Sequence, residues 1–189
     1  LKKVEDSAKI YNNPVSEYIV NGQVVTNHWA LSEITLLARV NMTPVSNEER
    51  DLRLDKSITR AEFVAMLYNS GLVDTTTEAE ADFVDVTGSE WYAKYLAWAV
   101  GNGIITGYDD DPVLGGNIIS RQEMAVVISK FSALTGKEFE SGEPAVFNDA
   151  ADIAAWAKPY VDDISAKSAV QGDNFGKFNP RKDLTRAES

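Results

Sequence analysis

One four-residue phrase occurs three times in this chain, and this recurrence limits the possible folds more than any other feature. Its copies are Thr59-Arg60-Ala61-Glu62, Ser120-Arg121-Gln122-Glu123 and Thr185-Arg186-Ala187-Glu188. The arginines lie 61 and 65 residues apart, and each follows a tryptophan by 30 or 31 residues. Those tryptophans are Trp29, Trp91 and Trp156. Two landmarks that keep the same spacing three times indicate a tandem repeat, in which neighbouring units share one core.

The repeat predicts three units after an N-terminal segment. The segment is 1–26, and the units are 27–70, 83–132 and 147–189. The first unit is the most degenerate, because it has Val45 where the other two have Gly107 and Gly172. The third is expected to be incomplete at its last helix, since Ser189 ends the sequence where an apolar stripe should begin. Either the natural chain continues, or another segment fills that part of the core, for which the N-terminal segment is the candidate.

The phrase itself predicts the start of a helix. A Ser or Thr three residues before a Glu forms a capping box, in which the hydroxyl and the carboxylate both bind free backbone N–H groups. Apolar residues at helical spacing follow the first two copies, beginning with Phe63 and Met124. The second unit is predicted to form helices near 90–101 and 121–134, separated by a loop rich in Gly, Asp and Pro. Each unit should therefore be a helix, a loop and a second helix, in a mainly α fold.

The capping box leaves the arginine of the phrase unexplained. A cation in the first turn faces the positive end of the helix dipole, which costs up to about 1 kcal/mol. Either a nearby carboxylate pairs with the guanidinium, or the guanidinium and the helix N-terminus bind an anionic ligand together. The spacing alone leaves both interpretations open.

The wider pattern resembles the S-layer homology (SLH) family, with three tandem modules. That family's modules run from Phe-x-Asp through Trp-Ala, Gly-Ile-Ile-x-Gly and Phe-x-Pro to Ile-Thr-Arg-Ala-Glu. The matching segments of this chain are 29–30, 58–62, 83–85, 91, 103–107, 119–123, 147–149, 156–157, 178–180 and 184–188. Three ordered copies of these motifs make the resemblance specific.

The resemblance implies a fold and a function. SLH modules pack as a pseudo-threefold spindle around a central helical bundle, and they anchor surface proteins non-covalently to the bacterial cell wall. The ligand is an acidic secondary cell-wall polysaccharide, commonly pyruvylated, which sits in grooves between modules. The implied carbohydrate-binding residues are Arg60, Arg121, Arg186, Trp29, Trp91, Trp156, Gly107 and Gly172. Arg121 ranks first among the arginines, because its unit keeps most of the family's pattern, and Arg186 ranks last.

A second hypothesis comes from another functional class. The same helical spindle could be a structural module of the S-layer or cell surface, with the arginines forming only internal ion pairs and the helices contacting other surface proteins. Both hypotheses predict a secreted protein at the bacterial cell surface, without a cofactor, a bound metal or catalytic residues. SLH segments are often joined to an enzyme elsewhere in their chain, so we expect no catalysis within these residues.

Composition excludes several other functions. The absence of cysteine from the 189 residues rules out disulfides, thiolate metal sites and cysteine nucleophiles. The net charge of −11 argues against a basic nucleic-acid-binding surface. This charge would also repel an anionic polymer, but screening over about 8–10 Å leaves local arginines to decide the contact. No apolar run approaches the roughly 18 residues that a membrane span needs, and no basic-then-apolar signal segment opens the sequence.

Three groups of residues have weaker alternatives. Asp109-Asp110-Asp111 could bind calcium, but the triplet lacks alternating ligand spacing and precedes Pro112, which favours a solvated turn. His28 is the only histidine, so no histidine-based zinc cluster can form. The repeat tryptophans could stack on sugar rings. Apolar neighbours at helical spacing favour core packing as their main role, with a partly exposed edge lining a groove.

Overall fold

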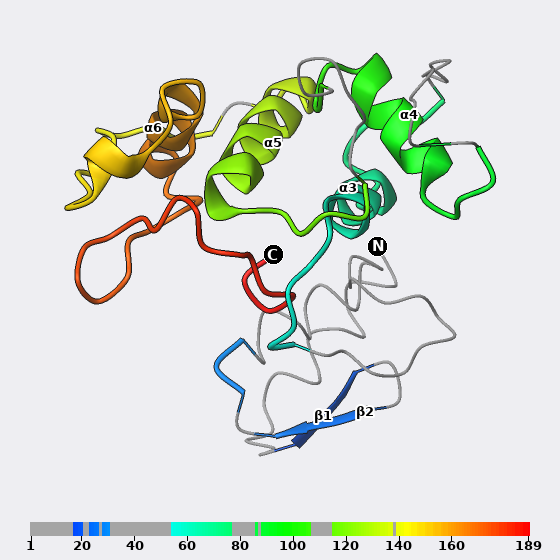
Figure 1. Ribbon diagram of the computed structural model, residues 1–189, viewed down its shortest axis with the longest axis horizontal. Coiled ribbons are helices and arrows are strands. Elements are labelled where there is room, and N and C mark those ends of the chain that lie inside the picture. Colours follow the sequence, from blue (N-terminus) through cyan, green and yellow to red (C-terminus); the bar gives the residue numbers. More distant parts are fainter. Residues whose placement is uncertain are drawn as a thin grey trace. The chain divides into compact units, whose positions relative to one another are not determined.

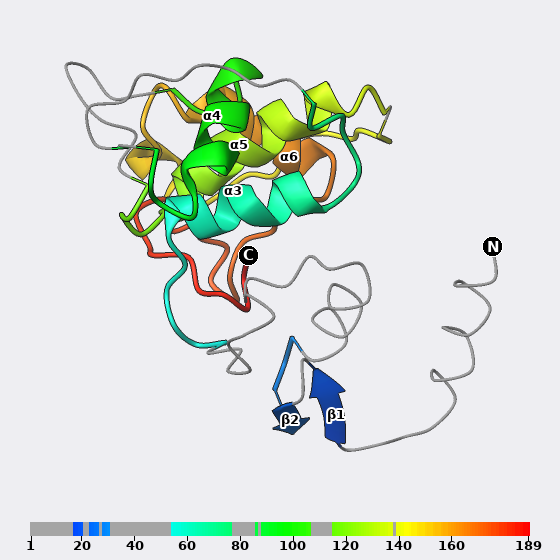
Figure 2. The ribbon, with the colours of Figure 1, turned by 90° about the vertical axis from the view of Figure 1, so that its right-hand side faces the viewer.

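The computed structural model divides the chain into two compact units, 1–52 and 53–189, which are described separately below (Figures 1 and 2). The structure describes residues 17–20, 23–26, 28–30, 54–76, 86, 88–106, 115–137 and 139–189. The predicted elements at Phe83-Val84-Asp85, Gly107 and Asp109-Asp110-Asp111 lie outside these residues.

The N-terminal unit contains a β-hairpin that the sequence analysis did not predict. Strand β1 (Glu17–Val20) pairs antiparallel with β2 (Gln23–Thr26), and Val20 lies opposite Gln23. The two residues between the strands are Asn21-Gly22, a dipeptide typical of tight hairpin turns. The expected packing of segment 1–26 on the core stays a prediction.

The larger unit is helical in its described residues, which confirms the mainly α class. Its helices are α3 (Arg60–Asn69), α4 (Ala93–Gly101), α5 (Arg121–Leu134) and α6 (Lys158–Ala166), with a 3₁₀ turn at Ala150–Asp152. The predicted helix at 121–134 matches α5, and the one predicted near 90–101 begins slightly later, as α4. Phe63 and Met124 are buried at 1% and 8% exposure, as their helical spacing requires.

The capping boxes of α3 and α5 are confirmed. Thr59 Oγ1 accepts from the Glu62 N–H at 3.2 Å, while the Glu62 carboxylate accepts from the Thr59 N–H at 2.9 Å. At α5, the Glu123 carboxylate accepts from the Ser120 N–H at 2.8 Å. Glu188 makes the same return contact to the Thr185 N–H at 3.1 Å, although residues 185–188 form only a bridge and a turn.

Backbone hydrogen bonds join the three phrases in a closed ring. In each phrase, the backbone N–H of the residue two places before the arginine donates to the backbone carbonyl of the corresponding residue in another phrase. The three bonds run from Ile58 to Leu184, from Ile119 to Ile58 and from Leu184 to Ile119, at 2.9–3.1 Å. All three side chains are buried to 1% exposure or less. Their central position shows that the phrases form one shared core. The pseudo-threefold arrangement of whole units remains a prediction.

The same ring uses the amide groups at the start of each helix. The arginine N–H groups donate to the carbonyl four residues before the next phrase's arginine: Arg60 to Asn117, Arg121 to Lys182 and Arg186 to Lys56, at 2.8–3.0 Å. The N–H group of the residue after each arginine donates to the carbonyl two places earlier in the same loop. These bonds run from Ala61 to Gly115, from Gln122 to Pro180 and from Ala187 to Leu54, at 2.9–3.0 Å. These are the amides that a helix normally leaves unpaired. The idea that they bind an external anion beside the arginine is therefore wrong.

Consecutive repeats interlock through their helices. Helix α3 of the first repeat packs on α4 of the second, and α5 of the second packs on α6 of the third (Figure 1). Tyr68 and Trp98 meet edge to face across the first of these interfaces, with ring centroids 5.3 Å apart. Across the other, the buried Ser129 donates a 2.6 Å hydrogen bond to Asp163. We call these contacts, with the arginine sites beside them, the first and the second junction.

Candidate functional site

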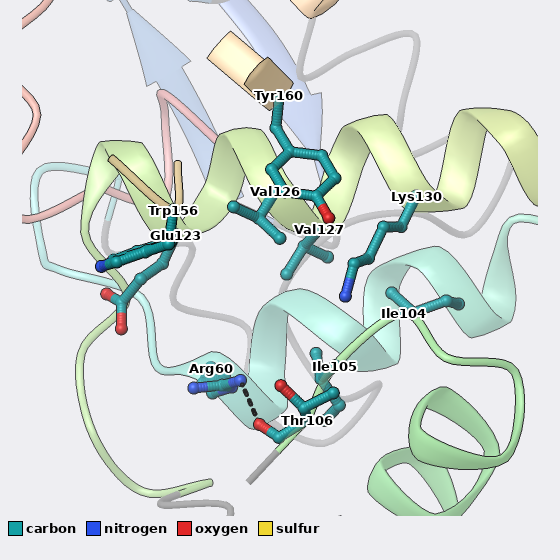
Figure 3. Close-up of a pocket in the computed structure, with 10 residues that line it drawn as sticks. All are labelled: Arg60, Ile104, Ile105, Thr106, Glu123, Val126, Val127, Lys130, Trp156 and Tyr160. Carbon is teal, nitrogen blue, oxygen red and sulfur yellow. Dashed lines mark hydrogen bonds between the residues drawn. The ribbon is translucent and has the colours of Figure 1, made fainter. Parts of the chain in front are cut away.

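A pocket of about 480 Å³ lies at the first junction and draws residues from all three repeats (Figure 3). The first repeat contributes Arg60. The second contributes two segments, one around the loop after α4 and one along α5, and the third contributes one aromatic residue of α6 and one that precedes this helix. In full, the lining is Arg60, Ile104, Ile105, Thr106, Glu123, Val126, Val127, Lys130, Trp156 and Tyr160.

One face of α5 forms a wall of this pocket. Glu123, Val126, Val127 and Lys130 follow the i, i+3, i+4, i+7 spacing that places side chains on one side of a helix. Two turns of helix separate the ends of this row, which is about 10 Å along the axis. The wall is therefore apolar in its middle and charged at both ends, with a carboxylate at one end and an ammonium at the other.

Arg60 is nearly buried, at 9% exposure, and its guanidinium lines the pocket. Its NH2 donates to the Thr106 carbonyl at 3.1 Å, which fixes the side chain against the loop of the second repeat (Figure 3). Together with Lys130, Arg60 gives the lining two cations against the single carboxylate of Glu123. Cations therefore outnumber carboxylates among the described lining residues, within a chain whose net charge is −11.

Arg121 occupies the equivalent place at the second junction, where several protein groups contact it. Its NH2 donates to the Gln171 carbonyl at 3.1 Å, which repeats the contact of Arg60 with Thr106. In addition, its Nε donates to the Phe178 carbonyl at 2.8 Å, and its guanidinium lies 5.2 Å from the centre of the Phe178 ring. The second junction thus satisfies its arginine with protein groups.

Carboxylates surround Arg121. Burial lowers the pKa of its guanidinium below the ordinary value, and the charges of Glu188, Asp173 and Asp149 oppose this shift. Lys182 pairs with Glu188 at 2.6 Å, and the charge of Lys177 acts on Asp173. Among these described groups, three cations face three carboxylates, so their charges balance.

Arg186 is the most deeply buried of the three arginines, at 5% exposure. Its NH1 donates to the Glu62 carboxylate at 2.7 Å, across 124 residues of sequence. Glu62 also caps α3, so this ion pair ties the third phrase to the first helix start. The carboxylate that the sequence analysis offered as one explanation for the arginine is present here.

The repeat tryptophans are not core residues, so the role first expected for them is wrong. Trp29, Trp91 and Trp156 are 68%, 60% and 53% exposed. The buried tryptophan is Trp98, at 2% exposure, because it lies within α4 and packs against Tyr68 of α3 and Phe131 of α5, whereas Trp91 precedes the helix. Of the exposed three, Trp156 lines the pocket.

Further motif residues hold the loops that form these sites. Phe147 is buried, and the carboxylate of Asp149 accepts from the Phe178 and Asn179 N–H groups at 2.7 and 2.8 Å. Close packing favours glycine at position 172, because a Cβ there would come within 3.2 Å of the Gly176 backbone. Sequence reasoning missed Lys130, Tyr160 and Glu123 as pocket residues. Lys130 could have been found from its spacing, because it lies seven residues after Glu123 and so on the same face of α5.

Comparison with known proteins agrees with this arrangement. The S-layer homology domain matches residues 82–125 and 146–188, which are most of the second and third repeats. These two segments are S-layer homology domains. The chain is a member of that family through them, and its first repeat shares their capping box and their place in the hydrogen-bonded ring.

Several known proteins resemble the chain, among them an enzyme, a surface-layer protein and an anchoring protein. It is 30% identical to exoglucanase XynX of Acetivibrio thermocellus over 87% of its length, and 29% identical to the surface-layer 125 kDa protein of Lysinibacillus sphaericus over 70%. It is also 30% identical to the cellulosome-anchoring protein of A. thermocellus over 55% of its length. The chain spans only 15%, 11% and 24% of these three relatives. The family and its surface-layer members indicate a cell-surface, cell-wall-associated location.

Two further findings concern the described part of the chain alone. None of its helices is long and apolar enough to cross a bilayer. Nor do three or more of its His, Asp or Glu side chains gather in a group that could hold a metal ion.

Proposed function

We propose that this chain anchors a surface protein to the bacterial cell wall by binding an acidic secondary cell-wall polysaccharide, of the pyruvylated kind that SLH modules bind. The observation that carries the proposal is the pocket at the first junction. It combines a fixed guanidinium, an excess of positive charge and an exposed tryptophan at the meeting point of three repeats.

Each of these features suits an acidic sugar. A guanidinium recognises a carboxylate through two parallel hydrogen bonds, and a partly buried site strengthens them because water competes less. An exposed indole face next to the cation can cover the apolar face of a sugar ring. The apolar wall formed by Ile104, Ile105, Val126 and Val127 would accept a methyl-bearing substituent such as a pyruvate ketal.

The proposal ranks the arginines differently from the sequence pattern. Arg60 lines the pocket and is proposed to contact the ligand. Arg121 and Arg186 are proposed to act mainly as ties between repeats, because protein carbonyls, carboxylates and an aromatic ring already surround them. Gly172 is proposed to support the second junction, and Trp91 is kept as a possible aromatic contact outside this pocket.

A matched pair of variants tests the ligand site. Arg60→Gln and Arg121→Gln remove the same charge from equivalent positions of two repeats. Binding of purified wall polysaccharide, measured by isothermal titration calorimetry, should weaken by about 1.5–3 kcal/mol in Arg60→Gln. Arg121→Gln should bind almost as the wild type does, once thermal unfolding has shown that the variant is folded. Equal affinity of Arg60→Gln and the wild type would contradict the proposal.

A second function is favoured by one observation. The Arg186–Glu62 ion pair is the internal pairing that a purely structural lattice module would use. Pull-down with purified peptidoglycan sacculi separates the two functions. If the chain binds sacculi before but not after acid removes the secondary polymer, it is a glycan anchor. If it binds neither preparation yet associates with other surface proteins, the lattice function is correct.

We also propose that this segment performs no catalysis. The enzymes among its relatives, such as exoglucanase XynX, share only a small part of their length with it. Their reactions would belong to other parts of those proteins.

A further inference from the structure

Lys130 is the lysine of the described helices that lines the pocket. Lys158 of α6 and Lys167, which follows that helix, form ion pairs with Asp162 and Asp163, and Lys94 of α4 lies against the Tyr68 and Tyr95 rings. For Lys130, the described residues provide no carboxylate within ion-pair distance, and its recorded contact is with the Tyr160 ring, whose centre lies 5.8 Å from Nζ. Its ammonium points into the pocket toward Ile104 (Figure 3).

The position of Lys130 separates it from Arg60. Figure 3 shows Arg60 close to the Glu123 end of the α5 wall, whereas Lys130 stands at the other end. Arg60 is held on the Thr106 carbonyl, whereas Lys130 lies against the Tyr160 ring. The two cations are therefore held by different groups of the pocket, so each can contact an acidic group of its own.

This second cation is a feature of one site rather than of the repeat. The first repeat has Asn69 where the second has Lys130, nine residues after the arginine of the phrase. A lysine that served only to cap or pack a repeated helix would be expected at both positions.

We propose that Lys130 is a specificity-determining residue, and that the pocket prefers a glycan segment with acidic groups on two sugars over a segment with one. In this arrangement Arg60 contacts one acidic group and Lys130 contacts the other. Trp156 and Tyr160 supply aromatic surface for the sugars in the same pocket. This inference rests on the proposed function of the same pocket.

The test uses two probes and four proteins. The probes are oligosaccharide fragments of a pyruvylated wall polysaccharide, one with a single acidic sugar and one with two. The proteins are the wild type, Lys130→Gln, Lys130→Arg and the control Lys94→Gln. Lys94 is a matched control because its Nζ lies 4.7 Å from the ring centre of Tyr95, which occupies the place in the second repeat that Tyr160 has in the third. Lys94 is not part of the pocket lining.

The wild type should bind the fragment with two acidic sugars about tenfold more tightly than the fragment with one, which corresponds to one additional charged hydrogen bond. Lys130→Gln should remove this preference, because it weakens binding of the doubly acidic fragment about tenfold more than binding of the singly acidic one. It should also make the affinity for the doubly acidic fragment less dependent on salt, because one fewer charge is neutralised. Lys130→Arg should retain the preference, and Lys94→Gln should behave as the wild type.

The outcomes separate this inference from the function on which it rests. If the wild type binds both fragments equally, or if Lys130→Gln weakens both by the same factor, the role given to Lys130 is wrong while the glycan anchor stands. If the folded wild type binds neither fragment, the proposed function itself fails. Circular dichroism and thermal unfolding of each variant exclude loss of folding as the cause.

Discussion

The two junctions share one backbone plan and differ in the side chains that fill it. At each, an arginine donates to the carbonyl of the same loop position in the next repeat, Thr106 at the first and Gln171 at the second. At the first junction the arginine lines a pocket, whereas at the second the arginine also donates to the Phe178 carbonyl and packs on the Phe178 ring. The repeated hydrogen bonds therefore fix the frame, and the side chains around them decide which junction is available to a ligand.

The helix interfaces show the same divergence. Tyr68 and Ser129 occupy equivalent places, eight residues after the arginine of the phrase, and Trp98 and Asp163 are equivalent seven residues after the repeat tryptophan. The first junction pairs two aromatic rings, and the second pairs a hydroxyl with a carboxylate. Each partner has changed in step with the other, so each interface remains internally matched.

The largest expected effect is at the aromatic interface. Trp98→Ala would remove a side chain that is 2% exposed and contacts both Tyr68 and Phe131. We expect a loss of about 3–5 kcal/mol in the free energy of unfolding, because a buried tryptophan leaves a large cavity. Chemical denaturation measures this loss. If Trp98→Ala lost less free energy of unfolding than Asp163→Asn, the aromatic interface would contribute less to stability than the polar one, contrary to our expectation.

The polar interface should depend on pH, whereas the aromatic one should not. Burial tends to raise the pKa of Asp163, but hydrogen bonds from Lys167 and Ser129 outweigh it and hold the pKa below its usual value. A carboxyl whose pKa is lowered by folding stabilises the protein above its unfolded pKa of about 4, and this contribution disappears as the pH falls through the folded value.

Asp163→Asn should therefore destabilise the protein at pH 7 by about 1–2 kcal/mol, toward the low end because part of the side chain is exposed to solvent. The difference from the wild type should shrink below about pH 4. Unfolding curves from pH 3 to pH 7 measure it. The loss in Trp98→Ala should stay nearly constant over the same range, and a constant difference for Asp163→Asn would show that its charge does not matter.

The smallest expected effect tests what the two junctions share. Glu123→Ala would remove the carboxylate of the α5 capping box, which typically contributes about 1 kcal/mol. Glu62→Ala should cost more, because it removes a capping carboxylate and also the ion-pair partner of the buried Arg186. Thermal unfolding measures both variants. If neither change lowers the unfolding temperature, the capping boxes do not stabilise the repeats.

Local signals allowed part of this structure to be predicted. The capping boxes at Thr59 and Ser120 and the extent of α5 depend on residues within a few positions of one another, so spacing sufficed. The pocket could not be predicted in this way, because Arg60, Lys130 and Trp156 meet only through the packing of three repeats. The exposure of the repeat tryptophans was also missed. A helix start with apolar neighbours does not reveal which side faces the core.

The most direct test of the central claim, that the first junction is the ligand site, is nuclear magnetic resonance of the tryptophan indole N–H groups during titration with wall polysaccharide. Trp156 lines the pocket, and Trp98 is buried away from solvent. The account predicts that the Trp156 signal shifts with saturation and that the Trp98 signal does not move. An unchanged Trp156 signal, together with shifts of the backbone amides of Arg121 and Phe178, would place the ligand at the second junction and contradict the account.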